Sequence, residues 1–389
     1  MNLIISGPRV YTEKNILENG IVEIQDGIIK KVDSAEKNSH ASEVLEFPAN
    51  YHLIPGFIDL HTHGANGHDV MDATPEALAV IAKALAAEGT TAFLATTMTA
   101  DVKEIEKALS VVNDFMQSPQ NKIGAKILGV HLEGPFLALT KMGAQRGDKI
   151  ISPDVDLLKK WEKISGDNIR LVTLAPEQKN SMAMIAYLKK QNIISSLGHT
   201  DATYAEACEA IEAGSSYATH LFNAMRGIHH REPGTVTAAL LSDDVTAELV
   251  VDGFHLHPGI VKLVLKIKGK EKIVLVTDAM RAKCLADGCY DLGGQDVYVE
   301  KGSARLKDGT LAGSVLKMPS AVQNMLNYTG CELIDAVKMA AENPAKLLGV
   351  FDYKGSIAVG KDADIVVLND SLEVVLTVCA GKIVCSVRR

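Results

Sequence analysis

GFIDLHTHG (residues 56–64) is a short apolar run that ends in small and polar residues. Stretches of helix-forming residues separate it from seven further runs of the same kind. Those runs are TAFLATTMT (91–99), KILGVHLEG (126–134), IRLVTLAPE (169–177), IISSLGHTD (193–201), SYATHLFNA (216–224), TAELVVDGFH (246–255) and KIVLVTDAM (272–280). Because strands alternate with helices, we expect a parallel α/β sheet, and eight units in about 290 residues predict a closed (β/α)8 TIM-type barrel.

The segments between these runs have the apolar period of helices. In 75–89, 181–191 and 203–214 the apolar residues recur at intervals of three and four, and Gly89 and Gly214 end two of the segments. An open doubly wound sheet is the competing architecture. The sequence has no GxGxxG or Walker-type loop after the first run, which counts against a nucleotide-binding sheet of that kind.

Both ends of the chain alternate in the manner of strands. NLIISGPRVYT, GIVEIQDGIIKKVDS and SEVLEFPANYHLIPG stand at the start, with a hairpin signal at QDG (25–27). GSIAVGKDADIVVLN and EVVLTVCAGKIVCSV stand near the end. We therefore predict a small β-sandwich domain built from both termini. The expected divisions are 1–54 and 350–389 for the sandwich and 55–349 for the barrel.

Composition narrows the class of partner. The 389-residue chain has a net charge of −8 and a pI of about 5.9, which argues against a nucleic-acid or membrane-surface binder. No apolar run approaches the ~20 residues needed to span a bilayer. The six cysteines lie far apart without a CxxC pair, which indicates reduced, mostly buried thiols. We expect a soluble cytoplasmic protein.

Acidic and imidazole side chains stand at the C-terminal ends of the predicted barrel strands, where barrel enzymes carry their chemistry. Asp59, His61 and His63 alternate, so they share one face of the first strand. The later runs contribute His131, Glu133, His199, His220, Asp252, His255 and Asp278. Since a barrel gathers its strand ends, these groups are expected to be close together, which is costly without a cation. The set therefore predicts a divalent metal site.

The donor atoms indicate the chemistry. Nitrogen and oxygen donors without cysteine sulfur suit Zn²⁺, Fe²⁺, Mn²⁺ or Co²⁺. A divalent ion at such a site supports hydrolysis, because it activates water and polarises a carbonyl group. We expect Asp278, on the last strand, to accept the proton of the attacking water and return it to the leaving nitrogen.

Several motifs resemble a known superfamily. PGFIDLHTHG, the strand-end Glu133, two later strand-end histidines and VTDAM look like the amidohydrolase superfamily, and GSIAVGKDADIVVLN is similar to its closing β segment. More narrowly, five motifs spread over nearly the whole chain resemble the family of N-acetylglucosamine-6-phosphate deacetylases. They are HLEGPF (131–136), LGHTDATY (197–204), HLFNAMRGIHHREPG (220–234), DGFHLHP (252–258) and LAGS (311–314).

This resemblance implies a reaction and a metal centre. The reaction converts N-acetyl-D-glucosamine 6-phosphate and water to D-glucosamine 6-phosphate and acetate. Glu133, His199 and His220 match the principal metal site, and His61 and His63 match a second one that Glu133 could bridge. The resemblance therefore implies one or two divalent ions per subunit.

The resemblance also implies catalytic and substrate-binding residues. Asp278 matches the catalytic acid/base, and His255 matches a substrate contact that polarises the acetyl carbonyl. The other matching substrate contacts are Ala144, Gln145, Asn223, Ala224, Arg231, Leu311, Ala312 and Gly313. A homodimer is implied as well, in which the partner subunit can complete the phosphate pocket.

The residues themselves support the phosphate contact. Arg226, His229, His230 and Arg231 form a basic cluster in an acidic chain, in the loop after the sixth run. A planar guanidinium suits a phosphate dianion. We therefore expect this cluster to bind the sugar phosphate.

Three other functions stay open. N-acetylgalactosamine-6-phosphate deacetylation would use the same metal site and phosphate contacts. A cyclic amidase such as a dihydroorotase, or a nucleobase deaminase such as an adenine deaminase, is less favoured. Members with a carboxylated lysine place it on the fourth strand, and IRLVTLAPE has no lysine. A catalytically dead barrel that acts as an assembly module should have lost ligands, but all the ligand positions are intact here.

Overall fold

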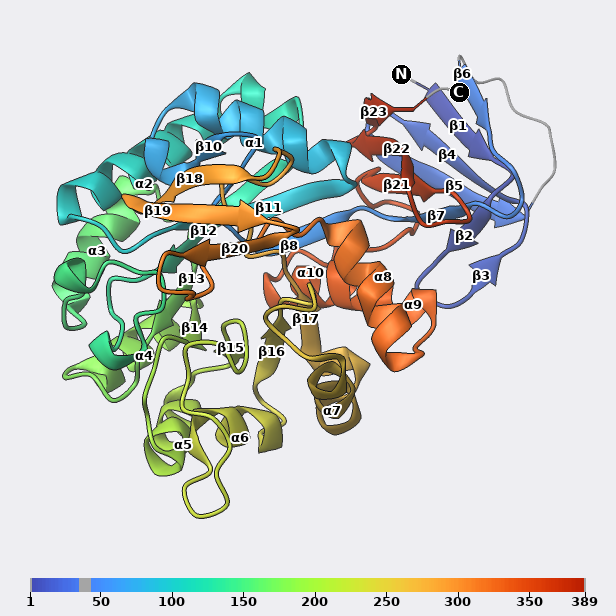
Figure 1. The fold of residues 1–389 in the computed structure, drawn as a ribbon. Helices are drawn as coiled ribbons and strands as arrows, with labels where there is room; N and C mark the ends of the chain where they lie inside the picture. The colour runs from blue at the N-terminus through green and yellow to red at the C-terminus, as the bar shows by residue number, and fades with distance from the viewer. Residues whose placement is uncertain (1, 35–42, 388–389) are drawn as a thin grey trace.

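The computed structural model describes residues 2–34 and 43–387, and Figure 1 shows the barrel that the sequence predicts. Eight parallel strands stand in the order β17-β16-β15-β14-β13-β12-β11-β8. They are β8 (Phe57–Thr62), β11 (Thr90–Thr97), β12 (Lys126–Glu133), β13 (Ile169–Leu174), β14 (Ile194–Leu197), β15 (Tyr217–Ala218), β16 (Thr246–Leu249) and β17 (Ile273–Leu275). Seven of the strands lie within their apolar runs and β11 begins one residue before its run, so the predicted (β/α)8 fold is confirmed.

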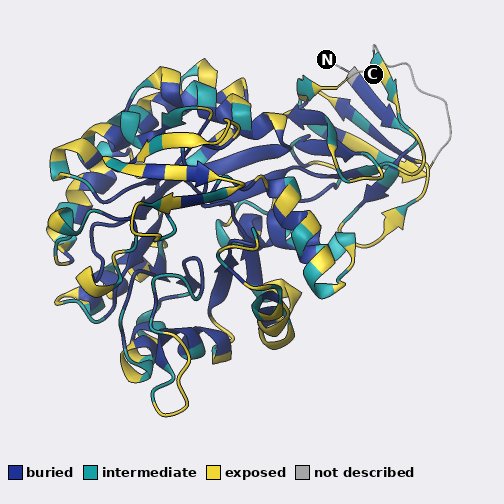
Figure 2. Cartoon of the chain, viewed as in Figure 1, coloured by how far each residue is buried: buried dark blue, intermediate teal, exposed yellow. Residues whose placement is uncertain are grey.

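Helices cover the outside of the barrel, with buried strands within and exposed residues on their outer faces (Figure 2). The helices are α1 (Pro75–Ala87), α2 (Val102–Gln117), α3 (Val155–Ile164), α4 (Ser181–Gln191), α5 (Tyr204–Ala213), α6 (Gly234–Leu241), α7 (Pro258–Lys268), α8 (Met318–Thr329), α9 (Leu333–Val337) and α10 (Asn343–Leu347). Helix α1 shows why these segments are helical. Thr74 accepts a hydrogen bond from the Ala77 amide at its start, Pro75 occupies the first turn, and Leu78, Ile81 and Leu85 are buried at helical spacing.

The two ends of the chain form two further sheets, the first from N-terminal strands alone and the second from strands of both ends. The described ends lie close together (Figure 1). One has the order β5-β4-β1-β6, and the other has the order β23-β22-β21-β7-β2-β3. Their strands are β1 (Asn2–Ser6), β2 (Arg9–Tyr11), β3 (Ile16–Leu17), β4 (Gly20–Gln25), β5 (Ile28–Ser34), β6 (Glu43–Glu46), β7 (His52–Pro55), β21 (Ile365–Leu368), β22 (Val374–Cys379) and β23 (Lys382–Ser386). The predicted QDG hairpin joins β4 to β5, with Asp26 and Gly27 both at positive φ.

Alternate residues of the two sheets form a common core. Its members include Leu3, Ile5, Val22, Ile24, Ile365, Val367, Leu376 and Val378. Strand β21 also buries its other face, because Val366 and Leu368 belong to the same apolar cluster as Phe57 of the barrel. A strand buried on both faces reads as a continuous apolar run, which explains the sequence IVVL.

A three-stranded antiparallel sheet was not predicted from the sequence. It consists of β18 (Gly288–Leu292), β19 (Gln295–Glu300) and β20 (Ser303–Leu306) and lies across the barrel mouth in Figure 1. The alternating pattern of β19, in which Val297 and Val299 are buried between exposed neighbours, and the tight Gly293–Gly294 turn were the available signals. A second small pair joins β9 (Gly64–Ala65) to β10 (His68–Asp69).

The first and last barrel strands meet through only a few contacts. In the described part of the chain, β8 and β17 share no strand ladder. Just beyond β17 the Asp278 amide donates to the His61 carbonyl at 2.8 Å. The Asp59 carboxylate accepts hydrogen bonds from the amide (3.2 Å) and the hydroxyl (2.5 Å) of Thr277. A side chain therefore replaces part of the missing ladder at this seam.

The remaining expectations fare differently. The divisions at 54/55 and 349/350 stay a proposal, and residues 1, 35–42 and 388–389 lie outside the described residues. The expectation of mostly buried thiols was wrong. Cys379 is buried, whereas Cys284 and Cys289 are exposed, the latter on β18. Within the described residues, no helix is long and apolar enough to cross a bilayer.

A buried ion pair joins the segment after α10 to the terminal sheets. The Lys354 side chain is 1% exposed, and its ammonium contacts the carboxylates of Asp362, at 3.0 Å, and Asp364. We expect Lys354→Met to lower the free energy of unfolding by about 3–5 kcal/mol, because it leaves a buried carboxylate unpaired. Chemical denaturation measures the change. Lys301→Met, at an exposed pair with Glu300, is the control, and equal stability of both variants would contradict the prediction.

Candidate active site

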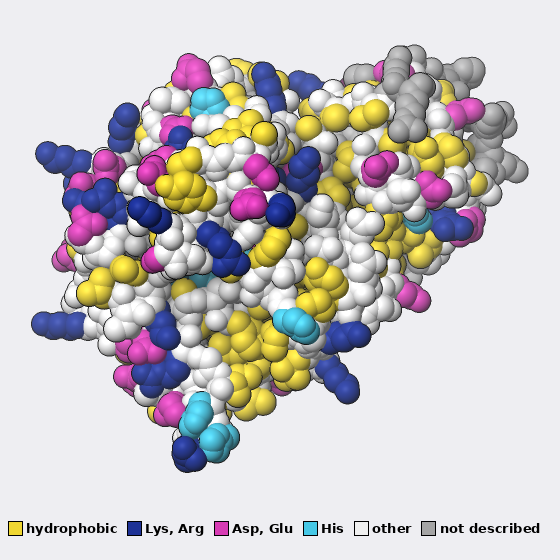
Figure 3. Space-filling view, viewed as in Figure 1, with side chains coloured by type: hydrophobic (Ala, Val, Ile, Leu, Met, Phe, Trp, Pro, Cys, Tyr) yellow, Lys and Arg dark blue, Asp and Glu magenta, His cyan; other side chains and the backbone are white. Residues whose placement is uncertain are grey.

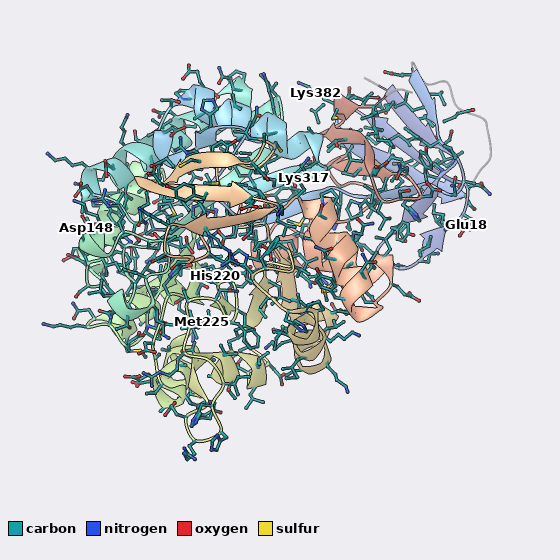
Figure 4. The ribbon with its side chains drawn as sticks, viewed as in Figure 1. Glu18, Asp148, His220, Met225, Lys317 and Lys382 are labelled. Carbon is teal, nitrogen blue, oxygen red and sulfur yellow. The ribbon has the colours of Figure 1, made fainter. Side chains whose placement is uncertain are left out.

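The ends of the barrel strands bring one set of polar side chains together. His61 lies near the C-terminal end of β8, and Glu133 is the last residue of β12. His199 and His220 lie just past the ends of β14 and β15. Figure 4 labels His220 at the centre of the barrel, below the three-stranded sheet. The geometric expectation from the sequence is therefore correct for these positions.

The carboxylate of Glu133 is the common neighbour of four imidazoles. Its Oε1 lies 3.2 Å from Nε2 of both His199 and His220 and 3.4 Å from Nε2 of His61. Its Oε2 lies 3.2 Å from Nε2 of His63. Two groups of ligand atoms result, each within 4.8 Å: His61, His63 and Glu133, and Glu133, His199 and His220. Glu133 belongs to both groups, so it has the position of a bridge.

The outer nitrogens of two rings determine what the inner nitrogens offer. His61 Nδ1 lies 2.8 Å from the Glu248 carboxylate, and His199 Nδ1 lies 2.9 Å from the Lys141 carbonyl. Both partners are acceptors, so each Nδ1 carries the proton and each Nε2 turns a lone pair inward. Nε2 of His199 lies 3.1 Å from Nε2 of His220, and Nε2 of His61 lies 3.3 Å from Nε2 of His63. Either a proton shared by the two nitrogens or a divalent cation bound to both accounts for each of these close approaches, so the residues fit a divalent metal.

The charges agree with this fit. Burial lowers the pKa of His63, but hydrogen bonds to Asp278 and Glu133 outweigh it and raise that pKa to about 9. Burial raises the pKa of Glu133, but the His61 charge and the hydrogen bonds of His199 and His220 hold it well below its usual range. A carboxylate and imidazoles that perturb one another so strongly demand positive charge, which protons or a divalent ion supply.

Asp278 lies beside this cluster and is ionised. Its Oδ1 lies 3.3 Å from His63 Nε2 and 3.4 Å from His61 Nε2. Burial raises the pKa of Asp278, but the two neighbouring imidazoles lower it far below the usual value. The backbone at His199, His220 and Asp278 is left-handed, with φ of 46°, 29° and 48°. Such strained turns cluster at functional sites, and here all three follow barrel strands.

His255 is paired with Asp252 at the next strand end. His255 Nδ1 lies 2.7 Å from Asp252 Oδ2, and Asp252 Oδ1 accepts from the amides of Phe254 and His255. Burial lowers the pKa of His255, but the hydrogen bond and charge of Asp252 outweigh it and raise the pKa above 6.5. Asp252 therefore favours the protonated form of His255, in which the other ring nitrogen is also a donor.

A cavity of about 330 Å³ opens over the cluster. The predicted residues that line it are His63, Glu133, Ala144, Gln145, His199, His220, Asn223, Ala224, His255, Asp278, Leu311 and Gly313. Gln145 also donates to Glu133 Oε2 at 2.7 Å, so it orients that carboxylate. Ala312 is buried under the three-stranded sheet instead of lining the cavity. Arg231 is exposed and does not reach the cavity of its own chain.

Two neighbours of the cluster have structural roles that the sequence did not assign. His131 donates to the Leu60 carbonyl (3.2 Å) and accepts from the Thr173 hydroxyl (2.7 Å), and burial and the His61 charge keep its pKa well below the usual value. It is a neutral scaffold residue. Glu248 was missed. A lone carboxylate in the apolar run TAELVV was the signal that could have revealed it.

The comparisons with known proteins agree with this geometry. Residues 52–384 match the amidohydrolase family, so the chain belongs to that family, whose members are metal-dependent hydrolases. The N-acetylglucosamine-6-phosphate deacetylase of Bacillus subtilis (strain 168) is 45% identical over 383 residues, which cover 98% of this chain and 97% of that one. The N-acetylgalactosamine-6-phosphate deacetylase of Escherichia coli O157:H7 is 37% identical and covers 96% and 97%.

Solved structures give the same answer. A mutant of the N-acetyl-D-glucosamine-6-phosphate deacetylase of Mycobacterium smegmatis, in complex with N-acetyl-D-glucosamine-6-phosphate, has a TM-score of 0.93 and 32% identity. The match covers 99% of this chain and 100% of that one. The chain is therefore an amidohydrolase enzyme, which confirms the predicted class and rules out the alternative of a catalytically dead barrel.

Removing the charge of Asp252 should discharge His255. In Asp252→Asn we expect the pKa of His255 to fall, because burial is then opposed only by the charge of Asp278. NMR titration of the imidazole measures this pKa. The Asp252–His255 pair contributes its full stabilisation between pH 3.8 and pH 6.5. That contribution is lost as pH falls through the lowered pKa of Asp252 or rises through the raised pKa of His255.

Asp244→Asn is the matched control, because it removes an exposed carboxylate at the opposite end of β16. An unchanged His255 titration in Asp252→Asn would show that the ion pair does not set the charge of this imidazole.

Proposed function

We propose that this chain hydrolyses the N-acetyl group of N-acetyl-D-glucosamine 6-phosphate to give D-glucosamine 6-phosphate and acetate. One observation carries the proposal: imidazoles converge on Glu133, with Asp278 beside them, at the floor of a cavity of about 330 Å³. Relatives with this activity in their names match the chain over nearly its whole length.

The proposed metal centre takes one or two divalent ions. Glu133, His199 and His220 would hold the first, and His61, His63 and Glu133 would hold the second. The nitrogen and oxygen donors suit Zn²⁺, Fe²⁺, Mn²⁺ or Co²⁺. When bound, such an ion supplies the Lewis acidity that lowers the pKa of water and polarises the acetyl carbonyl.

The protein residues then move the protons. Asp278 is ionised, so it accepts the proton of the attacking water and delivers it to the leaving nitrogen. The pair with Asp252 favours protonated His255, which donates a hydrogen bond to the acetyl oxygen as negative charge develops there. The residues proposed to hold the sugar are Ala144, Gln145, Asn223, Ala224 and the backbone of Leu311–Gly313, whose Ala312 contributes no side chain to the cavity.

The phosphate contact requires a second copy of the chain. Arg231 lies on the exposed loop 226–233, which projects from the barrel and carries histidine and basic side chains at the lower edge of Figure 3. Lys141 is the one Lys or Arg that lines the cavity among the described residues. We therefore propose a homodimer in which Arg231 reaches the phosphate in the partner's cavity. The expected cytoplasmic location also stays a proposal, which the absence of disulfides among the six cysteines supports.

N-acetyl-D-galactosamine 6-phosphate is the second candidate substrate, because a relative named for that reaction is 37% identical. Acetate release from the two epimers at equal concentration decides between them. Faster release from the galactosamine epimer would reverse the ranking. Activity on a cyclic amide or a free purine, with none on either sugar phosphate, would overturn the proposed function.

Asp278→Asn should lower kcat for acetate release by at least about 10²-fold, because general acid–base catalysis contributes 10²–10⁴-fold. Elemental analysis should find the same metal content as in the wild type. Near-normal kcat in this variant would show that another group moves the proton.

Arg231→Ala should raise KM for the 6-phosphate substrate by about 10- to 100-fold and leave unphosphorylated N-acetylglucosamine unaffected, since a hydrogen bond to a charged group is lost. Arg170→Ala, at an exposed position on β13, is the control. Sedimentation equilibrium tests the dimer. Equal losses on both substrates, or a fully active monomer, would contradict the role of Arg231.

A further inference from the structure

Glu248 is a fully buried carboxylate that the proposed reaction does not use. It lies on β16, whose four residues are all buried. Its Oε1 lies 2.8 Å from His61 Nδ1 and 2.8 Å from the backbone nitrogen of His220. One oxygen atom therefore contacts one residue from each of the two groups of candidate metal ligands.

The surroundings of Glu248 are poor for a purely structural carboxylate. Its other oxygen, Oε2, lies toward the buried hydroxyl of Tyr217, whose pKa is raised by burial and by its hydrogen bond with Glu248. A carboxyl group buried on an otherwise apolar strand loses its hydration, which costs stability even where it accepts hydrogen bonds. An apolar side chain of similar volume would fill this position at lower cost to the fold. The presence of a carboxylate here therefore calls for another reason.

The contact with His61 supplies that reason. An ionised carboxylate only accepts, so Nδ1 of His61 carries the proton and Nε2 presents its lone pair to the cluster. Nε2 then lies 3.4 Å from Glu133 Oε1 and 3.3 Å from His63 Nε2. A carboxylate behind an imidazole also raises the basicity of that ligand and holds the plane of its ring.

The second contact holds the neighbouring strand end. His220 has a left-handed backbone with φ of 29°, and its amide donates to Glu248 while the Leu221 amide donates to the Glu248 carbonyl. Glu248 thus anchors the turn that aims His220 at Glu133. Another buried carboxylate near the cluster, that of Asp59, contacts the backbone of His61 and not its ring.

We infer that Glu248 is a positioning residue of the metal centre, which acts through the ring of His61 to make the His61–His63–Glu133 group competent to bind an ion. The inference rests on the metal centre of the proposed function. Glu248 does not itself line the cavity, so we expect its effect on metal affinity rather than on a direct substrate contact.

Metal titration of the demetallated protein tests this role without substrate. Co²⁺ is added in competition with a chromophoric chelator, and its visible absorption is recorded. His61→Ala identifies the ion that depends on His61. Glu248→Leu removes the carboxylate and its acceptor oxygens. We expect it to lower the affinity for that same ion by about 10- to 100-fold and to change the absorption spectrum of the bound Co²⁺. Glu248→Gln keeps an acceptor oxygen without the charge and should fall between.

Glu162→Gln is the matched control, because Glu162 is also buried and accepts from the Tyr187 hydroxyl at 2.5 Å, but lies on α3 far along the chain from every candidate ligand. Circular dichroism checks that each variant folds, and Glu248→Gln carries the test alone if Glu248→Leu does not. Wild-type affinity and spectrum in the Glu248 variants would overturn the inference. It would also be overturned if His61→Ala weakened the binding of no ion.

The outcomes separate the two proposals. Metal binding that depends on Glu248, in a protein that releases no acetate, would contradict the proposed substrate and leave the positioning role standing. Acetate release with metal affinity independent of Glu248 would do the reverse.

Discussion

The side chain of Glu133 is the constraint on which the site depends. A single carboxylate lies within 3.4 Å of four imidazole nitrogens that come from three different strand ends. Such an arrangement is tolerable only where surrounding structure holds each ring in place and a positive charge balances the site. The barrel meets the first condition because its parallel strands all direct their C-terminal ends to one rim.

Two of the rings and the shared carboxylate are held by different kinds of partner. His61 is held by a carboxylate, His199 by a backbone carbonyl, and Glu133 itself by the amide of Gln145. The carboxylate partner lies on β16, and the carbonyl and amide partners both lie in the loop after β12. The geometry of the cluster therefore depends on segments that contribute no ligand. His255 follows the same rule, since Asp252 sets both its orientation and its charge.

The repeating strand–helix units of the barrel could be predicted from the sequence, whereas features that occur once in the fold were missed. Eight apolar runs with polar ends are a periodic signal, so the barrel, His61, His63, Glu133, His199, His220 and Asp278 were all found. The sheet β18–β20 was missed because it interrupts the alternation once and has short strands. Glu248 was missed because its role is visible only when the fold brings its side chain to the ring of His61, on β8, and to the amide of His220, after β15. Arg231 has the right chemistry, but the sequence could not show that its loop points away from its own cavity.

The seam between β8 and β17 has a consequence for how the enzyme responds to its ligands. These two strands have few backbone hydrogen bonds in common, yet they bear His61 and His63 on one side and Asp278 on the other. Whatever binds between those side chains also clamps the beginning of the barrel to its end. By mass action, occupancy of the centre and resistance of the ring to opening are linked quantities.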